Sequence, residues 1–296
     1  MCFFVFLVCS LVRAFMAVRH DACVVAEKQL RTLADAERLA RDPELGLSFE
    51  VLLHFLSQKT VSHIKSTHGK HTQAAARYVE RYLAGESLIS LAESLSLPPT
   101  KLARIILENH LGAGRRGEAS QVLKNPKLLS DLRLQQEVAA AVEADAYQGP
   151  HVDTCKRLIG LEYEDLLEQK LRAQGVPFLT EEQQRLRGDA KTPDVLLPVP
   201  LLVRGRVVNW IDSKAMFGDP TTHSEYGDQF RAYVNRFDAG LVIYWFGYDA
   251  SIDADVRCSS THVCVCMSRA SPSKSGTRCC ELSHAARVTL WRRRRG

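Results

Sequence analysis

Residues 192–214 read TPDVLLPVPLLVRGRVVNWIDSK, and this segment gives the clearest indication of the fold class. Two runs rich in Val and Leu, Asp194–Val203 and Val207–Ala215, stand on either side of Arg204-Gly205-Arg206, and their spacing predicts a β-hairpin. The first run contains two prolines, which have no N–H to donate to a neighbouring strand. We therefore expect this strand to lie at a sheet edge or to be interrupted at the prolines.

Helical patterns lie on both sides of the hairpin. The segment from Pro150 to about Ala173 begins with a proline suited to a first helical turn, and a glycine follows its end. Ser224–Phe237 has helical spacing after the hairpin. Ala239–Phe246 is nearly all apolar, as is typical of a central strand covered on both faces. Helix, hairpin, helix and buried strand together predict an α/β core.

The chain before this core, from about Leu47 to Ala146, has a mainly helical pattern. Ser87–Leu95 and Lys101–Leu111 are two short helical segments joined by a five-residue break, which makes them a helix-turn-helix candidate. Lys101 and Arg104 lie near the start of the second segment, where a recognition helix contacts DNA. A packing unit without DNA contact is the alternative, because the segment has no dense basic stripe.

The hairpin also carries the side chains that are candidates for catalysis or metal binding. Side chains alternate across a strand, so Asp212 and Lys214 share a face, and antiparallel pairing can bring Asp194 beside them. Two carboxylates and an ammonium group in one place are costly unless a divalent cation neutralises the acids. With no His or Cys nearby, the two aspartates favour Mg²⁺ or Mn²⁺ as the metal. This pattern indicates phosphodiester hydrolysis, with Lys214 offsetting charge in the transition state.

Asp194 followed by Asp212-x-Lys214 resembles the PD-(D/E)XK motif of the restriction-endonuclease-like nucleases, whose core is a mixed sheet flanked by helices. Gln229 and Tyr233 resemble the Q-x-x-x-Y element of exonuclease-like members of that superfamily. In those proteins a glutamate of the first helix completes the metal site. The resemblance implies that role for Glu164, with Glu162 as the alternate. The two lie about 200° apart on a helix, so only one of them can face the site.

A closer resemblance, from about Ser48 to Asp255, is to the codanin-interacting nuclease family, also called the TPD-motif family. The blocks that carry it are Gly160–Glu164, Lys191–Asp194, Trp210–Ala215, Phe217–Asp219, Asp228–Phe230 and Gly240–Trp245. The resemblance implies an all-α region with a helix-turn-helix, a Mg²⁺-dependent nuclease domain and binding to codanin. It also implies residence in the nucleus, with some protein in the cytoplasm, and a link to erythropoiesis. One departure is Asp212, where the family pattern has Glu.

Composition sets the limits of this interpretation. The chain has 296 residues, 46% of them hydrophobic, and no apolar run reaches the 18 or so residues that span a bilayer, so we expect a globular protein without membrane insertion. Residues 256–296 carry a net charge of +8 and the rest of the chain −3, so basicity is confined to the tail. The nine cysteines match no disulfide or zinc pattern, which favours free thiols.

We expect four parts: an atypical N-terminal segment over 1–45, a helical domain with the helix-turn-helix over 46–147, a nuclease-like domain over 148–257, and a disordered or aberrant basic tail over 258–296. Three functions stay open. The first is an active metal-dependent nuclease, for which DNA is the expected substrate. The second is an adaptor that binds codanin, and the third is a helix-turn-helix DNA-binding protein without hydrolysis.

Overall fold

The computed structural model describes residues 17–110, 116–203, 206–252 and 263–266. These residues form two compact units. The sheet unit comprises the described residues up to Leu56 and from Ile159 onward, and the helical unit comprises Ser57–Leu158. The chain is therefore mixed α/β with a helical region before the sheet, as its sequence predicts.

Five strands within the described ranges form a mixed sheet in the order β2-β3-β4-β5-β7. They are β2 (Leu179–Thr180), β3 (Val195–Val203), β4 (Arg206–Lys214), β5 (Gly240–Tyr244) and β7 (Val263–Cys266). Neighbours are antiparallel from β2 to β4 and parallel from β4 to β7. All residues of β5 are buried, which confirms the prediction of a central strand.

The predicted hairpin is confirmed by the antiparallel pairing of β3 with β4. The pairing is regular up to Leu196 and resumes at Leu201, and the irregular part of β3 between them contains Pro198 and Pro200. This interruption is the one that the two prolines predict, since neither has an N–H for the ladder.

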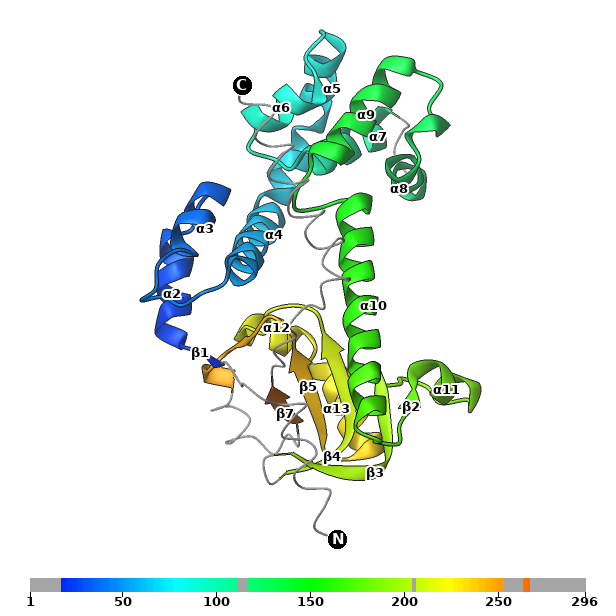
Figure 1. Cartoon of the computed structure of the whole chain (residues 1–296). Helices are drawn as coiled ribbons and strands as arrows, with labels where there is room; N and C mark the ends of the chain where they lie inside the picture. The colour runs from blue at the N-terminus through cyan, green and yellow to red at the C-terminus, as the bar shows by residue number, and fades with distance from the viewer. Residues whose placement is uncertain (1–16, 111–115, 204–205, 253–262, 267–296) are drawn as a thin grey trace. The chain divides into compact units, whose positions relative to one another are not determined.

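Two helices cover opposite faces of the sheet (Figure 1). One core lies beneath α10 (Pro150–Ala173) and includes Leu167, Leu171, Ile211, Leu241 and Ile243. The other lies beneath α13 (Gly227–Phe237) and includes Trp210, Phe230, Tyr233, Val242 and Tyr244. Each fully buried side chain of this size contributes roughly 1.5–3 kcal/mol, so both faces hold the strands firmly in register.

The single helix expected over Ser224–Phe237 is two helices in the structure. A short helix, α12 (Pro220–Glu225), comes before α13, and the break lies at Tyr226. The earlier start follows from Asp219, whose carboxylate caps α12 by accepting a hydrogen bond from the N–H of Thr222 at 3.0 Å. A short helix, α11 (Glu181–Leu186), also lies between β2 and β3.

The helical unit packs around one apolar core. Its helices include α5 (Ala75–Leu83), α6 (Leu88–Ser94), α7 (Pro99–His110), α8 (Arg116–Lys124) and α9 (Leu132–Ala144). Leu88 and Leu91 of α6 pack in this core with Leu102 and Ile106 of α7. The two short helices joined by a tight turn are therefore present where the sequence predicts them. No helix of the described residues combines the length and the hydropathy needed to cross a bilayer.

The N-terminal segment is packed against the sheet unit from residue 17 onward. The described part contains β1 (Ala17–Val18), α2 (His20–Gln29) and α3 (Leu33–Leu39), and α4 (Phe49–Gln73) follows. β1 pairs in parallel with β6 (Tyr248–Asp249). The Nδ1 atom of His20 lies 2.9 Å from a carboxylate oxygen of Asp249. The first 16 residues of the atypical N-terminal segment lie outside the described residues.

The tail contains a strand that its composition does not predict. The sequence predicts a disordered or aberrant basic tail over 258–296, and for Val263–Cys266 the prediction of disorder is wrong, because β7 extends the sheet beside β5. Valine is a strand former, and four residues are enough for a parallel ladder on a buried neighbour. The remaining tail, including Arg292–Arg295, lies outside the described residues.

Candidate active site

The turn that leads into β3 is held by side chains from two helices. The amide of Gln184 on α11 donates to the carbonyl of Pro193 at 2.9 Å. The hydroxyl of Tyr233 on α13 donates to the carbonyl of Thr192, also at 2.9 Å. Because both carbonyls are fixed from outside the strand, Asp194 enters β3 in a defined position.

Asp194 and Asp212 lie at the same end of the hairpin. The backbone N–H of Ser213 donates to Oδ2 of Asp194 at 2.6 Å, which ties the end of β4 to the start of β3. Asp212 is 1% exposed, and its Oδ2 lies 2.6 Å from Nζ of Lys214. The hairpin thus brings together the two carboxylates and the ammonium group that the sequence singles out.

One oxygen of this site is left without a partner. Among the described residues, no hydrogen bond reaches Oδ1 of the buried Asp212. A buried carboxylate oxygen without a partner costs free energy, roughly 1–3 kcal/mol or more for a charged group. A divalent cation would satisfy this oxygen, so the donor set fits a hard metal ion such as Mg²⁺.

The carboxylates of the site interact strongly. Burial, and next the charge of Asp212, raises the pKa of Asp194 well above its ordinary value. Burial also raises the pKa of Asp212, against the attraction of Lys214. Burial alone would lower the pKa of Lys214, but its pairing with Asp212 outweighs this and raises it. Without a cation, the two aspartates therefore resist carrying two full negative charges together.

The structure distinguishes the two glutamates of α10. Glu164 is partly buried, and its pKa is raised by burial and by the charges of Glu181 and Asp212, although Lys214 opposes this. Glu162 is exposed. Glu164 is thus the glutamate of this helix whose charge interacts with Asp212 and Lys214.

Two further residues belong to the surroundings of the site. Glu181, the first residue of α11, accepts a hydrogen bond from Oγ1 of Thr192 at 3.2 Å, and its charge raises the pKa of both Glu164 and Asp212. The ring of Tyr226 lies 4.7 Å from Nζ of Lys214. Sequence reasoning missed both: the Thr180-x-x-Gln183 capping box predicts a helix start there, but it gives no sign of proximity to the aspartates.

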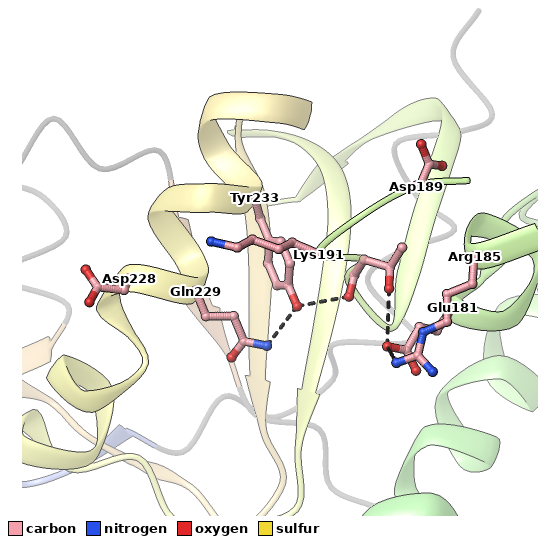
Figure 2. Close-up of a pocket in the computed structure, with 8 residues that line it drawn as sticks. Glu181, Arg185, Asp189, Lys191, Asp228, Gln229 and Tyr233 are labelled. Atoms are coloured by element: carbon pink, nitrogen blue, oxygen red, sulfur yellow. Dashed lines mark hydrogen bonds and ion pairs between the residues drawn. The ribbon is translucent and has the colours of Figure 1, made fainter. Parts of the chain in front are cut away.

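Gln229 and Tyr233 form a hydrogen-bonded pair on one face of α13. Nε2 of Gln229 donates to the hydroxyl of Tyr233 at 2.7 Å, as Figure 2 shows. Because the Tyr233 hydroxyl donates in turn to the carbonyl of Thr192, the pair supports the turn before Asp194. Tyr233 is buried against Trp210, whereas Gln229 lines an open pocket.

Lys101 and Arg104 lie on α7 in the helical unit, both partly exposed. An Nη atom of Arg104 donates to Oγ of Ser120 at 2.9 Å and lies 4.0 Å from a carboxylate oxygen of Glu108. Burial and the charge of Arg104 lower the pKa of Lys101. Arg104 therefore has packing partners within the unit.

The Phe217–Asp219 block packs against the first turns of α4, within the sheet unit. Nε2 of His54 lies 2.6 Å from Oδ2 of Asp219, and both side chains are nearly buried. The rings of Phe55 and Phe217 pack edge to face beside this pair, with centroids 5.5 Å apart. This block therefore has a structural role next to the end of β4.

The sequence also matches known proteins. A family model described as "Protein of unknown function TPD sequence-motif" matches residues 130–268. The protein named CDAN1-interacting nuclease 1 from Xenopus tropicalis is 41% identical over 253 residues, which cover 80% of this chain and 83% of that protein. The proteins of the same name from Homo sapiens and Danio rerio are 39% identical over 219 residues (69% of this chain, 78% of that protein) and 36% identical over 241 residues (76% and 80%).

No solved structure matches the chain. The relatives, however, are matched over more than two thirds of their length at well above 30% identity, and the matched region includes Thr192-Pro193-Asp194. The chain therefore belongs to the TPD-motif family that includes the CDAN1-interacting nucleases.

Proposed function

We propose that the chain is a divalent-metal-dependent nuclease of the PD-(D/E)XK type that hydrolyses phosphodiester bonds of DNA. The observation that carries the proposal is the buried Asp212, whose Oδ1 has no hydrogen-bond partner among the described residues, beside Asp194 and Lys214. The printed names of the relatives, which call those proteins nucleases, support the same reaction class.

Asp194 and Asp212 would hold Mg²⁺ or Mn²⁺. Within the described ranges, no three His, Cys, Asp or Glu side chains lie close enough to hold a metal ion by themselves. The protein ligands proposed here are therefore two carboxylates; proteins usually bind Mg²⁺ through one or two carboxylates, with water and substrate phosphate oxygens as the other ligands. When bound, the ion supplies charge neutralisation and acidifies a water molecule.

The other residues have roles that follow from their positions. Lys214, with its ammonium 2.6 Å from Asp212, is held where negative charge develops on the phosphoryl group. Glu164, whose pKa is raised, interacts with the charges of the same centre and is suited to accept a proton from the attacking water. Gln229 and Tyr233 keep Asp194 in place through the carbonyl of Thr192.

The proposal includes a partner and a location. The relatives' names state an interaction with CDAN1, and on that basis we propose that this chain acts with codanin. The location that we propose, the nucleus and to some extent the cytoplasm, rests on the family resemblance of the sequence alone. DNA contact by Lys101 and Arg104 of α7 is part of the same proposal. Alanine at Lys101 should then weaken DNA binding without changing codanin binding.

The test is cleavage of labelled single-stranded, duplex, flap and junction DNA, and of RNA, by the full chain with Mg²⁺, Mn²⁺ or EDTA. We expect cleavage of at least one DNA with either metal and none with EDTA. Asp194→Ala should abolish it, whereas Asp165→Asn, an exposed carboxylate on α10, should not. Absence of cleavage by the wild type on every substrate, or full activity of Asp194→Ala, would contradict the proposal.

The second candidate is an adaptor that binds codanin and needs no cleavage, which the interaction in the relatives' names favours. The Lys214→Ala variant distinguishes the nuclease from the adaptor. An active nuclease should lose at least about 100-fold in rate while binding codanin as before, because removing one transition-state donor typically costs that much. An adaptor would show tight codanin binding in both proteins and no turnover in either.

A further inference from the structure

A polar pocket of about 470 Å³ opens beside the candidate active site, between α11, α13 and the segment before β3. Thr192 and Glu181 line it and also belong to the surroundings of the aspartates. Thr192 is two residues from Asp194, which is at most about 7 Å along the chain. A molecule in the pocket would therefore lie next to any group that reacts at Asp194 and Asp212.

The charges that line the pocket are almost all paired. Each of its three carboxylates lies against an arginine: Glu181 with Arg185, Asp189 with Arg236, and Asp228 with Arg231. Lys191 is exposed and has no ion pair within the part of the chain that the structure describes. The side chains that line the pocket carry three negative and two positive charges. Arg231 and Arg236, which pair with Asp228 and Asp189 from outside the lining, bring the group to one surplus positive charge. Lys191 is the member without a counter-charge among the described residues, which favours an anionic group beside it.

The backbone at Lys191 is in an unusual conformation. Its φ is +54°, in the left-handed region that lysine rarely adopts and that glycine or asparagine adopts at lower cost. The turn is held by hydrogen bonds to the carbonyls of Ala190, Thr192 and Pro193, from Arg236, Tyr233 and Gln184 respectively. Figure 2 shows the Lys191 side chain extending over the pocket towards α13, on the side of Gln229. Residues with strained backbone conformations cluster at active sites and ligand-binding sites.

We propose that this pocket is a phosphate subsite, in which Lys191 and Gln229 bind a phosphate of the nucleic-acid strand next to the phosphodiester that is cleaved. Nε2 of Gln229 has a second N–H beyond the one that it donates to Tyr233. The inference rests on the proposed nuclease function, because it assigns the pocket to the same substrate. The phosphate comes either from the interior of the strand or from its 5′ end.

The test is DNA binding by the full chain, measured by fluorescence anisotropy in EDTA so that no cleavage occurs. Lys191→Asn removes the ammonium and suits the left-handed backbone, so it should fold at least as well as the wild type. It should weaken binding about tenfold and lower the slope of log affinity against log salt by about one. Lys191→Arg should keep most of the affinity, and Lys28→Asn, an exposed lysine of α2 in the same unit, should bind as the wild type.

Two oligonucleotides, one with a 5′-phosphate and one with a 5′-hydroxyl, distinguish the sources. A loss of affinity for both in Lys191→Asn assigns an interior phosphate, and a loss for the phosphorylated one alone assigns the terminal phosphate. Unchanged affinity and salt dependence for both would overturn the subsite. Failure of the nuclease proposal looks different: the wild type would cleave nothing with Mg²⁺ or Mn²⁺, whatever Lys191→Asn does to binding.

Discussion

Replacing Asp219 by asparagine should destabilise the sheet unit by an amount that depends on pH. The carboxylate is 10% exposed and accepts hydrogen bonds from Nε2 of His54 at 2.6 Å and from the N–H and hydroxyl of Thr222. Asparagine has nearly the same shape, but it removes the charge and replaces one acceptor oxygen by an NH₂ group that faces a donor. The loss of the charge is the part of the change that depends on pH. Asp219 lies five residues after the end of β4, at the start of α12.

The magnitude follows from the pKa of Asp219. Burial alone would raise this pKa, but the hydrogen bonds from His54 and Thr222 lower it from 3.8 to about 2. Each pKa unit corresponds to about 1.4 kcal/mol, so the charged form stabilises the fold by about 2 kcal/mol. A depressed carboxylate pKa gives stability that is fully present above pH 4 and is lost as the pH falls towards 2.

The assay is urea unfolding followed by the fluorescence of Trp210 and Trp245, both buried in the sheet unit, at pH 7 and at several values down to pH 2. Asp219→Asn should lose about 2 kcal/mol at pH 7, and the difference should shrink towards zero near pH 2. Asp165→Asn, an exposed carboxylate, should show little difference at any pH. An equal loss at pH 7 and pH 2, or no loss at pH 7, would refute the linkage to Asp219.

Three further predictions follow from the geometry. Glu164→Gln should reduce cleavage at least about tenfold and Glu162→Gln should leave it unchanged in a rate assay with Mg²⁺, because the charge of Glu164 interacts with Asp212 and Lys214, whereas Glu162 is exposed. Gly240→Ala should destabilise the sheet unit by more than about 3 kcal/mol in urea, because the added Cβ would lie 1.9 Å from the indole of Trp210. A chain truncated after residue 262 should melt several degrees below one truncated after residue 266, because only the longer chain keeps Val263–Cys266 as β7 beside β5; equal melting temperatures would contradict the pairing.

The elements with strong local signals could be predicted from the sequence. α10 begins at Pro150 and ends at Ala173 as expected, since a proline at the first helical position and a glycine beyond the last turn act within a few residues. The limits of the hairpin and the interruption at its prolines likewise depend on residues within the hairpin itself. The aspartates and Lys214 could be placed together because strand alternation and antiparallel pairing leave few alternatives.

What could not be predicted depends on contacts between distant parts of the chain. Glu181 approaches the aspartates only because α11 folds back to hold the turn before β3, and no spacing in the sequence encodes that distance. β7 is four residues long and lies in a tail of irregular composition, so it is recognised by its pairing with β5 and not by a pattern of its own. The positive φ of Lys191 likewise results from hydrogen bonds to carbonyls on both sides of it.

We propose that the buried aspartates at the end of the hairpin form a divalent-metal site. The most direct measurement is the melting temperature of the wild type and of Asp212→Asn with and without Mn²⁺. The wild type should melt at a higher temperature when Mn²⁺ is added, because an ion that binds the folded state and not the unfolded state stabilises the folded state. Asp212→Asn removes a carboxylate that would hold the ion, so it should not respond to Mn²⁺. It should melt below the metal-free wild type, because it leaves the mostly buried Lys214 without its ion-pair partner. An equal rise in both proteins, or no rise in the wild type, would contradict the account.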